Sequence, residues 1–208
     1  YLAQTEAGVV TGMRPSDHAL KPGGMGQVLP GVEVRLVDQN LKDVELGTPG
    51  EILVRCGEPG RFITMRAYYN DAQATKDAFV DGWLRTGDVA YEDEDGYLFF
   101  SDRAKDMIVS GGLNIYSREV ELALIEHPAV SDAAVFGVPD EAYGEAVTAC
   151  IQLKEGMSVS AEDLIEFCRA DLAGYKKPKY IHFMDNMPRT SSGKVQKYEL
   201  KKGYIDGA

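Results

Sequence analysis

Basic side chains are in deficit in this chain. Its 208 residues include 22 Lys and Arg against 33 Asp and Glu, a formal net charge of −11, and the pI is near 4.8. Nucleic-acid-binding surfaces depend on clustered Lys and Arg, because these side chains neutralise phosphates. The composition therefore excludes nucleic acid as the expected partner. Any anionic ligand has to be met by local cations or by backbone amides.

Cysteine is also scarce. The three cysteines are Cys56, Cys150 and Cys168, and none of them stands in a CxxC or His-x-Cys spacing. An odd number of unevenly spaced cysteines in apolar surroundings favours reduced core thiols over a disulfide framework, and it argues against a cysteine-based metal site. We therefore expect a cytoplasmic protein.

Long hydrophobic runs are missing. No apolar segment is long enough to span a bilayer, and no basic segment followed by an apolar one marks a leader. The sequence begins at Tyr1 rather than at methionine, in what reads as the interior of a larger domain. A chain of this length can bury one full core or two modest ones. We expect part of a larger protein without a membrane span.

The first half of the chain has the pattern of β-strands. Residues 32–36 alternate between apolar and charged side chains, and a further strand is predicted over 51–55 after a turn-like segment. Asp95-Gly96, between two strand-like segments, is the strongest hairpin signal. The region is expected to form a turn-rich, distorted half-barrel.

After residue 105 the pattern changes to alternating helices and strands. The expected elements are helices starting at caps Ser117 and Ser160 and strands over 133–138, 146–153 and 180–184. A spacing of four places Leu164, Cys168 and Leu172 on one buried face of the second helix. We therefore predict an α+β fold with two domains, 1–104 and 105–208.

Two side chains of the first domain are candidates for ligand binding. Asp88 follows a glycine turn, and at the start of a strand its carboxylate can accept hydrogen bonds from two adjacent sugar hydroxyls. The alternative is a turn aspartate bonded to backbone amides. Arg103 can reach ribose or phosphate across the hairpin, or else it forms a surface ion pair.

Two shorter segments have equally open interpretations. Gly111-Gly112 permits positive φ or the close approach of another chain, and its alternative is a plain tight turn between strands. Thr5 and Glu6 place a hydroxyl beside a carboxylate, as a phosphate contact and a magnesium ligand require, although this pair is also common in helices.

The most informative segment is 188–194, in which small polar residues precede Lys194. Hydroxyls and amides in a flexible loop before an ammonium group suit an oxyanion ligand. The remaining lysines near this end are interpreted as a solvated basic rim favourable to a phosphorylated cosubstrate. They are Lys176, Lys177, Lys179, Lys197, Lys201 and Lys202.

Taken in order, these segments resemble the adenylate-forming superfamily of acyl-CoA synthetases, luciferases and peptide-synthetase adenylation domains. The resemblance covers nearly the whole chain, and several ordered motifs are far more specific than one short pattern. Besides the segments above, it rests on Tyr68-Tyr69-Asn70 with Thr75, Pro139-Asp140 with Gly144-Glu145, and 192–197.

The resemblance implies an ATP-dependent acid-CoA ligase. A carboxylate attacks the α-phosphate of ATP to give acyl-AMP and pyrophosphate, and the thiol of coenzyme A then displaces AMP. It implies that residues 1–104 are the C-terminal part of a large, distorted β-barrel-like AMP-binding domain, and that 105–208 form a mobile lid. ATP, Mg²⁺, coenzyme A and a carboxylic acid are the expected ligands, with fatty acid metabolism as the setting.

The resemblance also assigns roles by motif. Lys194 bridges the substrate carboxylate and the α-phosphate, and Lys105 is the hinge at which the lid rotates. Rotation brings Gly111-Gly112 to the pantetheine of coenzyme A. The first domain contributes Thr5 at the α-phosphate, Glu6 at magnesium, Asp88 at both ribose hydroxyls, and Arg103 beside it.

Some features depart from the family pattern. Leu2 stands where the family has a tyrosine that stacks on adenine, with Tyr1 next to it. The glycine- and threonine-rich phosphate loop and most of the acid pocket are absent, so the chain by itself is expected to make no acyl-AMP. The alternatives are a non-catalytic lid module that binds a nucleotide or a partner, and a peptide-synthetase adenylation domain. The sequence of residues 106–112 resembles acyl-CoA synthetases more than peptide-synthetase domains.

Overall fold

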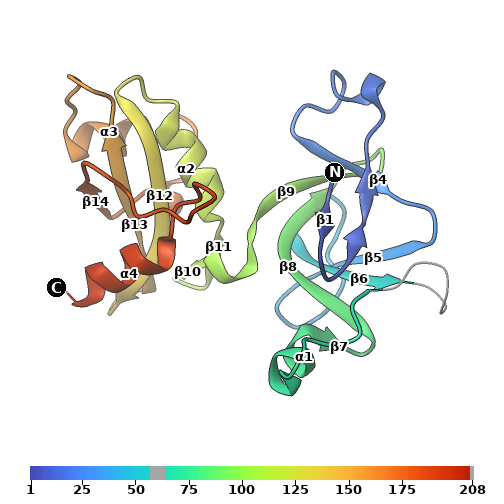
Figure 1. Ribbon diagram of the computed structural model, residues 1–208. Coiled ribbons are helices and arrows are strands. Elements are labelled where there is room, and N and C mark those ends of the chain that lie inside the picture. Colours follow the sequence, from blue (N-terminus) through green and yellow to red (C-terminus); the bar gives the residue numbers. More distant parts are fainter. Residues whose placement is uncertain (57–63, 207–208) are drawn as a thin grey trace. The chain divides into compact units, whose positions relative to one another are not determined.

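A computed structural model describes residues 1–56 and 64–206 of the chain (Figure 1). The chain folds as two compact units, Tyr1–Lys105 and Asp106–Ala208. Each unit has its own buried hydrophobic cluster. The predicted α+β class is confirmed, since a curled sheet comes first and a helix-covered sheet follows. Within the described residues, no helix combines the length and apolar character needed to cross a membrane.

The first unit is built on a seven-stranded sheet with the order β3-β4-β9-β8-β6-β5, to which β7 is added beside β8. All of its described neighbours are antiparallel. A separate hairpin of β1 (Ala3–Gln4) and β2 (Gly8–Val9) begins the chain. The sheet strands are β3 (Thr11–Gly12), β4 (Gly24–Val28), β5 (Val32–Val37), β6 (Gly50–Cys56), β7 (Phe79–Val80), β8 (Trp83–Glu92) and β9 (Tyr97–Arg103). Three short helices occur in its described residues: η1 (Pro15–Asp17), α1 (Ala72–Ala78) and η2 (Ala104–Asp106), the last of which crosses the boundary to the second unit.

The apolar positions of these strands form the core of the first unit. β5 pairs with β6 along its whole length, from Val32 opposite Cys56 to Val37 opposite Glu51. The buried cluster includes Ile52, Leu84 and Leu98, each almost fully removed from water. Burial of each such side chain contributes about 1.5–3 kcal/mol. The predicted strands and their alternation are confirmed here.

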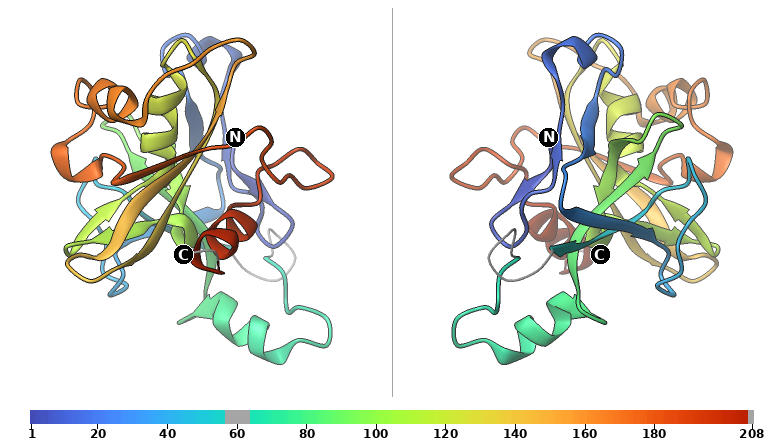
Figure 2. Two further views of the ribbon diagram at one scale, coloured as in Figure 1. Left: turned by 90° about the vertical axis from the view of Figure 1, so that its left-hand side faces the viewer. Right: turned by 90° about the vertical axis from the view of Figure 1, so that its right-hand side faces the viewer.

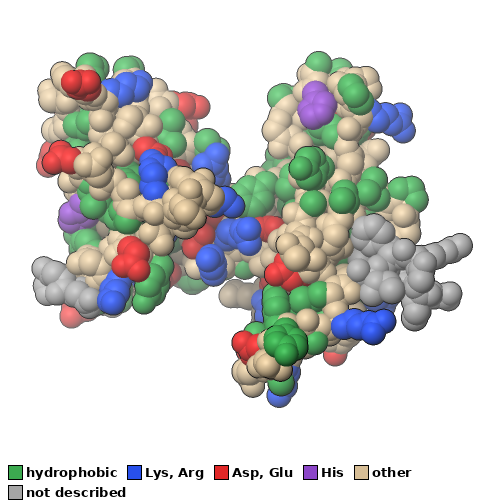
Figure 3. Space-filling view, in the orientation of Figure 1, with side chains coloured by type: hydrophobic (Ala, Val, Ile, Leu, Met, Phe, Trp, Pro, Cys, Tyr) green, Lys and Arg blue, Asp and Glu red, His purple; other side chains and the backbone are tan. Residues whose placement is uncertain are grey.

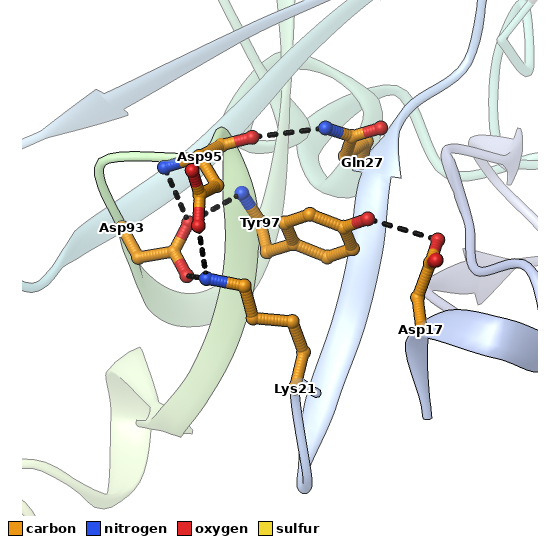
Figure 4. Close-up of polar contacts among 6 residues, drawn as sticks. All are labelled: Asp17, Lys21, Gln27, Asp93, Asp95 and Tyr97. Carbon is orange, nitrogen blue, oxygen red and sulfur yellow. Dashed lines mark hydrogen bonds and ion pairs between the residues drawn. The ribbon is translucent and has the colours of Figure 1, made fainter. Parts of the chain in front are cut away.

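The predicted hairpin joins β8 and β9, and a polar cluster holds its turn (Figure 4). The Lys21 ammonium lies 2.6 Å from a carboxylate oxygen of Asp93 and 2.6 Å from one of Asp95. The Tyr97 hydroxyl donates a hydrogen bond of 2.9 Å to Asp17. Segments distant in sequence therefore hold the turn that joins β8 to β9.

The second unit is built on a five-stranded sheet of order β11-β10-β13-β12, in which β14 lies parallel to β13 and the other pairs are antiparallel. Its strands are β10 (Ile108–Ser110), β11 (Leu113–Ile115), β12 (Val130–Asp140), β13 (Gly144–Leu153) and β14 (Tyr180–Phe183). Its helices are α2 (Ser117–Ile125), α3 (Ala161–Phe167), η3 (Gly174–Lys176) and α4 (Lys197–Asp206). The predicted strands over 133–138, 146–153 and 180–184 are confirmed within these bounds.

Alternate residues of β12 face two different clusters, as the period of two in a strand requires. Ala133 and Val135 belong to the cluster that contains side chains of α2 and α3. Ala134 and Phe136 belong to the cluster that contains Leu200 of α4. Therefore α2 and α3 cover one face of the sheet and α4 covers the other (Figure 1).

Two helix predictions in this unit need correction. The helix after Ser160 ends at Phe167, so Leu172 lies beyond it, although Leu164, Cys168 and Leu172 all remain buried in one cluster. The Ser160 cap itself is confirmed, because its hydroxyl accepts the Asp163 amide at 3.1 Å. The predicted Ser117 cap is wrong. Tyr116 occupies the cap position of α2, and its side chain makes no capping hydrogen bond to the helix.

The expectation of reduced core thiols is confirmed for Cys150 and Cys168, which are free and buried. Burial raises the pKa of the Cys150 thiol to about 11, and burial together with nearby Asp171 raises the pKa of Cys168 to about 11. Both thiols are therefore neutral and unreactive at physiological pH. The side chain of Cys56 lies outside the described part of the chain.

Candidate functional site

Asp88 lies inside β8, and its environment depends on an irregularity of that strand. In the pairing of β6 with β8, Glu51 lies opposite Val89 and Leu53 lies opposite Arg85. One residue of β6 therefore faces three residues of β8, so β8 bulges at this point. Gly87 takes up the irregularity with a φ of 69°, a value that costs glycine no steric strain. The prediction that Asp88 begins a strand is wrong, because the strand already starts at Trp83.

Both carboxylate oxygens of Asp88 accept charged or polar donors. Arg103, directly opposite in β9, places Nε 2.8 Å from Oδ1. Gln4, from the β1–β2 hairpin, donates its Nε2 to Oδ2 at 2.5 Å and to the Thr86 carbonyl at 3.1 Å. Asp88 is only 4% exposed. These donors set the plane of the carboxylate, and since a carboxylate oxygen accepts more than one hydrogen bond, ligand hydroxyls can join them.

Arg103 forms the ion pair that was its alternative interpretation, with Asp88 as the partner, and the ligand-binding roles of both residues stay predictions. Arg103 and Gln4 reach the carboxylate with their side chains, whereas the turn-aspartate alternative rested on backbone amides. The partner of Arg103 in this ion pair is Asp88, the residue whose carboxylate is the candidate for ligand binding. Gln4 was missed, because its partner lies 84 residues away; its position directly before Thr5-Glu6 was the available signal.

Thr5 and Glu6 occupy the turn between β1 and β2, so the helical alternative is wrong. One carboxylate oxygen of Glu6 accepts the Tyr68 hydroxyl at 3.1 Å, and its carbonyl accepts the Met65 amide at 2.6 Å. The pKa of Tyr68 is raised, mainly by desolvation of the phenol and to a smaller extent by this hydrogen bond to Glu6. Thr5 is exposed.

A single carboxylate fits one kind of metal better than others. Among the described residues, no three His, Cys, Asp or Glu side chains converge to enclose an ion. Glu6 can therefore hold only a cation that takes its other ligands from water and from phosphates, as Mg²⁺ does beside a nucleotide.

The residue that replaces the expected adenine-stacking tyrosine is part of the core. Leu2 is 7% exposed within the buried cluster of the first unit, and its amide donates to the Thr11 hydroxyl at 2.7 Å. Tyr1 is 81% exposed. The aromatic ring at this end of the chain therefore lies on the surface, and Leu2 serves packing.

Lys105 is exposed and lies in η2, where the first unit ends. The structure gives it a place at the boundary, and its role as a hinge stays a prediction.

Gly111 and Gly112 form the turn between β10 and β11, with φ of 58° and 80°. Positive φ at both central residues is the preferred geometry of a two-residue hairpin, so the tight-turn interpretation is confirmed. The turn borders a depression of about 380 Å³, whose lining includes Tyr143, Tyr175, Lys177 and Lys179. A tight turn and a ligand surface are thus compatible here.

The segment before Lys194 is a closed turn, rather than the flexible loop that its composition indicated. The Thr190 amide donates to the Lys194 carbonyl at 2.8 Å, and the Lys194 amide donates to the Thr190 hydroxyl at 3.1 Å. Arg189 and Val195 form a β-bridge at its base. In both views of Figure 2 the segment before α4 makes an outward loop. The Lys194 side chain is exposed, and no hydrogen bond or ion pair of its ammonium occurs among the described residues.

Ion pairs hold several members of the predicted basic rim. The solvated interpretation is wrong for Lys176 and Lys197, whose side chains are 19% and 20% exposed, whereas the paired Lys179 remains 48% exposed. Lys176 pairs with Glu119 at 2.7 Å and Lys179 with Asp140 at 2.5 Å. Lys197 pairs with the buried Glu121 at 2.6 Å. On the face shown in Figure 3, basic and acidic side chains are interspersed over the coloured surface. The sequence overstated the free positive charge, because each partner is remote in the sequence.

Comparison with known proteins identifies the class first. The fold matches a structure of o-succinylbenzoate CoA synthetase from Bacillus subtilis in complex with its acyl-adenylate intermediate (TM-score 0.80, 36% identity, 92% of this chain and 38% of that one). It also matches an amide bond synthetase from Marinactinospora thermotolerans (TM-score 0.84, 37% identity, 98% and 40%). The fold is that of adenylate-forming enzymes.

Two family models then match the sequence: AMP-binding enzyme over residues 2–69, and AMP-binding enzyme C-terminal domain over residues 119–194. The chain belongs to the AMP-binding enzyme family. A long-chain-fatty-acid–CoA ligase of Yersinia pestis is 42% identical over 193 residues, 93% of this chain and 33% of that protein. The chain spans about a third of the length of the curated relatives it matches.

Proposed function

We propose that the chain is the C-terminal part of an ATP-dependent acid-CoA ligase, which activates a carboxylic acid as acyl-AMP and transfers the acyl group to coenzyme A. The observation that carries the proposal is the buried Asp88 carboxylate, with one oxygen held by Arg103 and the other by Gln4. A preset carboxylate of this kind suits the two adjacent hydroxyls of a ribose. Membership of the AMP-binding family supports this ligand.

In the first half-reaction a carboxylate oxygen of the acid attacks the α-phosphorus of ATP. The new bond joins the carboxylate oxygen to the α-phosphorus and makes a mixed carboxylic–phosphoric anhydride, and the bond from the α-phosphorus to the pyrophosphate oxygen breaks. Because an anion attacks an anion, positive charge at the reacting oxygens lowers the barrier, by about 3 kcal/mol for one well-placed donor. Lys194 would supply that charge, since its ammonium is exposed at the end of a closed turn. Thr5 would contact the α-phosphate.

Glu6 would hold magnesium together with phosphate oxygens, and the ion would neutralise the charge of the triphosphate. Tyr68 donates to one oxygen of this carboxylate. The phenol thereby orients Glu6, and the other oxygen is available to the cation. Asp88 and Arg103 would meanwhile bind the ribose.

In the second half-reaction the thiol sulfur of coenzyme A attacks the acyl carbon. The bond from that carbon to the AMP oxygen breaks, and the thiol proton leaves. The depression beside Gly111 is lined by Lys177, by Lys179 in its pair with Asp140, and by two tyrosine rings, which suit a cosubstrate with phosphates and an adenine. We infer that the second unit turns about Lys105 between the two steps, so that Lys194 serves the first step and Gly111-Gly112 the second.

The test uses the full-length enzyme with a panel of carboxylic acids. We expect acid-dependent exchange between ATP and pyrophosphate, followed by thioester formation on addition of coenzyme A. Since a structural neighbour is named as an amide bond synthetase, amines are offered as acceptors in parallel. If the enzyme catalyses pyrophosphate exchange and forms an amide but no thioester, the acyl acceptor is an amine rather than coenzyme A. An absence of exchange with every acid, with nucleotide still bound, would favour the non-catalytic alternative.

A further inference from the structure

Lys197 is the first residue of α4, three positions after Lys194, and it is held in a partly enclosed polar site. Its ammonium lies 2.6 Å from Oε1 of Glu121 and 2.6 Å from the hydroxyl of Ser117. The Lys197 side chain is 20% exposed and that of Glu121 is 7% exposed. A surface lysine that only improves solubility has no need of such partners.

The same carboxylate oxygen joins three elements of the second unit. Glu121 belongs to α2, and its Oε1 also accepts the Val135 amide of β12 at 3.0 Å. Lys197 adds the start of α4 to this junction. An ion pair removed from water is maintained only where further hydrogen bonds compensate for the lost hydration. Here a serine hydroxyl and a strand amide supply those bonds.

The junction adjoins the turn that carries Lys194. The Gln196 amide donates to the Pro188 carbonyl at 2.8 Å and closes the base of the turn one residue before Lys197. On the other arm, Arg189 donates to the Gly193 carbonyl at 2.8 Å and pairs with Asp132 of β12. The turn is therefore attached to the sheet layer on both sides of Lys194.

We propose that Lys197 is a positioning residue for adenylation. By binding Glu121 and Ser117 it fixes the start of α4, and so the direction in which the turn presents the Lys194 ammonium. Because the Lys194 side chain is exposed, the position and direction of its backbone determine where its ammonium can reach. This inference rests on the proposed function of Lys194, and it adds a residue that acts through Lys194 without touching the substrate.

The kinetic test compares four variants of the full-length enzyme. K197M should lower kcat for adenylation by about 10- to 100-fold, the effect expected when a reacting group is displaced by about 1 Å. KM for ATP and the rate of thioester formation from supplied acyl-AMP should stay within about twofold of wild type. K197R should restore most of the rate, because a guanidinium can reach the same carboxylate.

Loss of stability is separated from loss of position by a double variant. K197M/E121M removes both charges, and such replacement of a buried pair is often neutral for stability. We expect its unfolding midpoint to recover while adenylation stays slow. The matched control is K201M, one turn further along α4, whose pair with Glu145 is longer, at 3.3 Å, and 40% exposed on the lysine side. K201M should keep its adenylation rate.

A readout without catalysis uses amide hydrogen exchange of the chain. K197M should speed exchange at the Thr190 and Lys194 amides, which close the turn, and K201M should leave both unchanged. Wild-type exchange and wild-type kcat in K197M would overturn the inference, as would a double variant that regains the full rate. If the unmodified enzyme makes no acyl-AMP, the proposed function fails, and exchange alone decides whether Lys197 holds the turn.

Discussion

Asp88 receives two side-chain donors from separate parts of the first unit, and this determines what each donor can be tested for. Arg103 is carried by the neighbouring strand, so its place follows from strand register. Gln4 comes from the β1–β2 hairpin and approaches the other oxygen. Loss of the Gln4 side chain should leave the ion pair between Arg103 and Asp88 intact, and Oδ2 of Asp88 should lose the donor that fixes its position.

Gln4→Leu is therefore expected to weaken AMP binding by about fivefold to tenfold, the effect of about one lost hydrogen bond. It should also narrow the preference for AMP over 2′-deoxy-AMP, because a less well oriented carboxylate discriminates less between one hydroxyl and two. Calorimetric titration of the full-length enzyme with both nucleotides measures this. Gln27→Leu is the control, since that amide binds only the hairpin turn at Asp95 in the described contacts. Equal affinities in the Gln4 variant and wild type would show that Gln4 has no part in the site.

At the residue scale, the motifs pointed to two residues that the structure brings into contact, and the ligand roles of these residues stay predictions. Asp88 and Arg103 were singled out, and their contact follows from a hairpin that was legible in the sequence. Gln4 was assigned no role, and Lys197 was wrongly placed in a solvated basic rim, because each contacts a carboxylate far away in the sequence. Contacts of this kind depend on tertiary packing, which local pattern does not encode.

Among the elements, the β8–β9 hairpin connects the candidate site to a charged cluster at its opposite end. Burial opposes ionisation of Asp93, but hydrogen bonds from Lys21 and from the amides of Tyr97 and Asp95 outweigh it and lower the pKa of this carboxyl. A carboxyl whose pKa is lower in the folded state stabilises that state above its unfolded pKa. This stabilisation is lost as the pH falls through the folded value.

Lys21→Met should therefore destabilise the first unit at neutral pH, and the difference from wild type should shrink as the pH falls through the lowered pKa of folded Asp93, because protonation of this carboxyl removes its ion pair from wild type as well. Urea unfolding of the chain across this range provides the measurement. Lys76→Met, on α1, serves as the matched control and should change the midpoint little at any pH. A Lys21 variant whose deficit stays constant down to the lowest pH would contradict the account of the cluster.

Elements with a strong local signal were predicted well, and those decided by tertiary contacts were not. The turn at Asp95-Gly96 and the alternation of 32–36 gave the hairpin and β5 correctly. The Ser117 hydroxyl looked like a helix cap, but it accepts the Lys197 ammonium instead. The helix after Ser160 was predicted too long, because spacing of four continued past its end at Phe167.

For the molecule as a whole, the division into two units with separate cores is the property that the proposed function requires. In the proposed mechanism, the second unit presents a lysine to the acid in one step and a different surface to the thiol in the next. Composition and strand pattern were enough to predict the α+β class. The net charge of −11 was informative about excluded partners, but it gave no indication that the basic side chains near the end of the chain are largely paired.

The most direct test of the central claim measures the two half-reactions of the full-length enzyme separately, in the Lys194→Ala variant. Acid-dependent pyrophosphate exchange should fall by about a hundredfold or more, since about 3 kcal/mol of charge stabilisation is removed. Thioester formation from supplied acyl-AMP should remain near wild type. Lys202→Ala, an exposed lysine of α4, should leave both rates unchanged. Equal loss of both half-reactions in Lys194→Ala, or retention of exchange, would contradict the account.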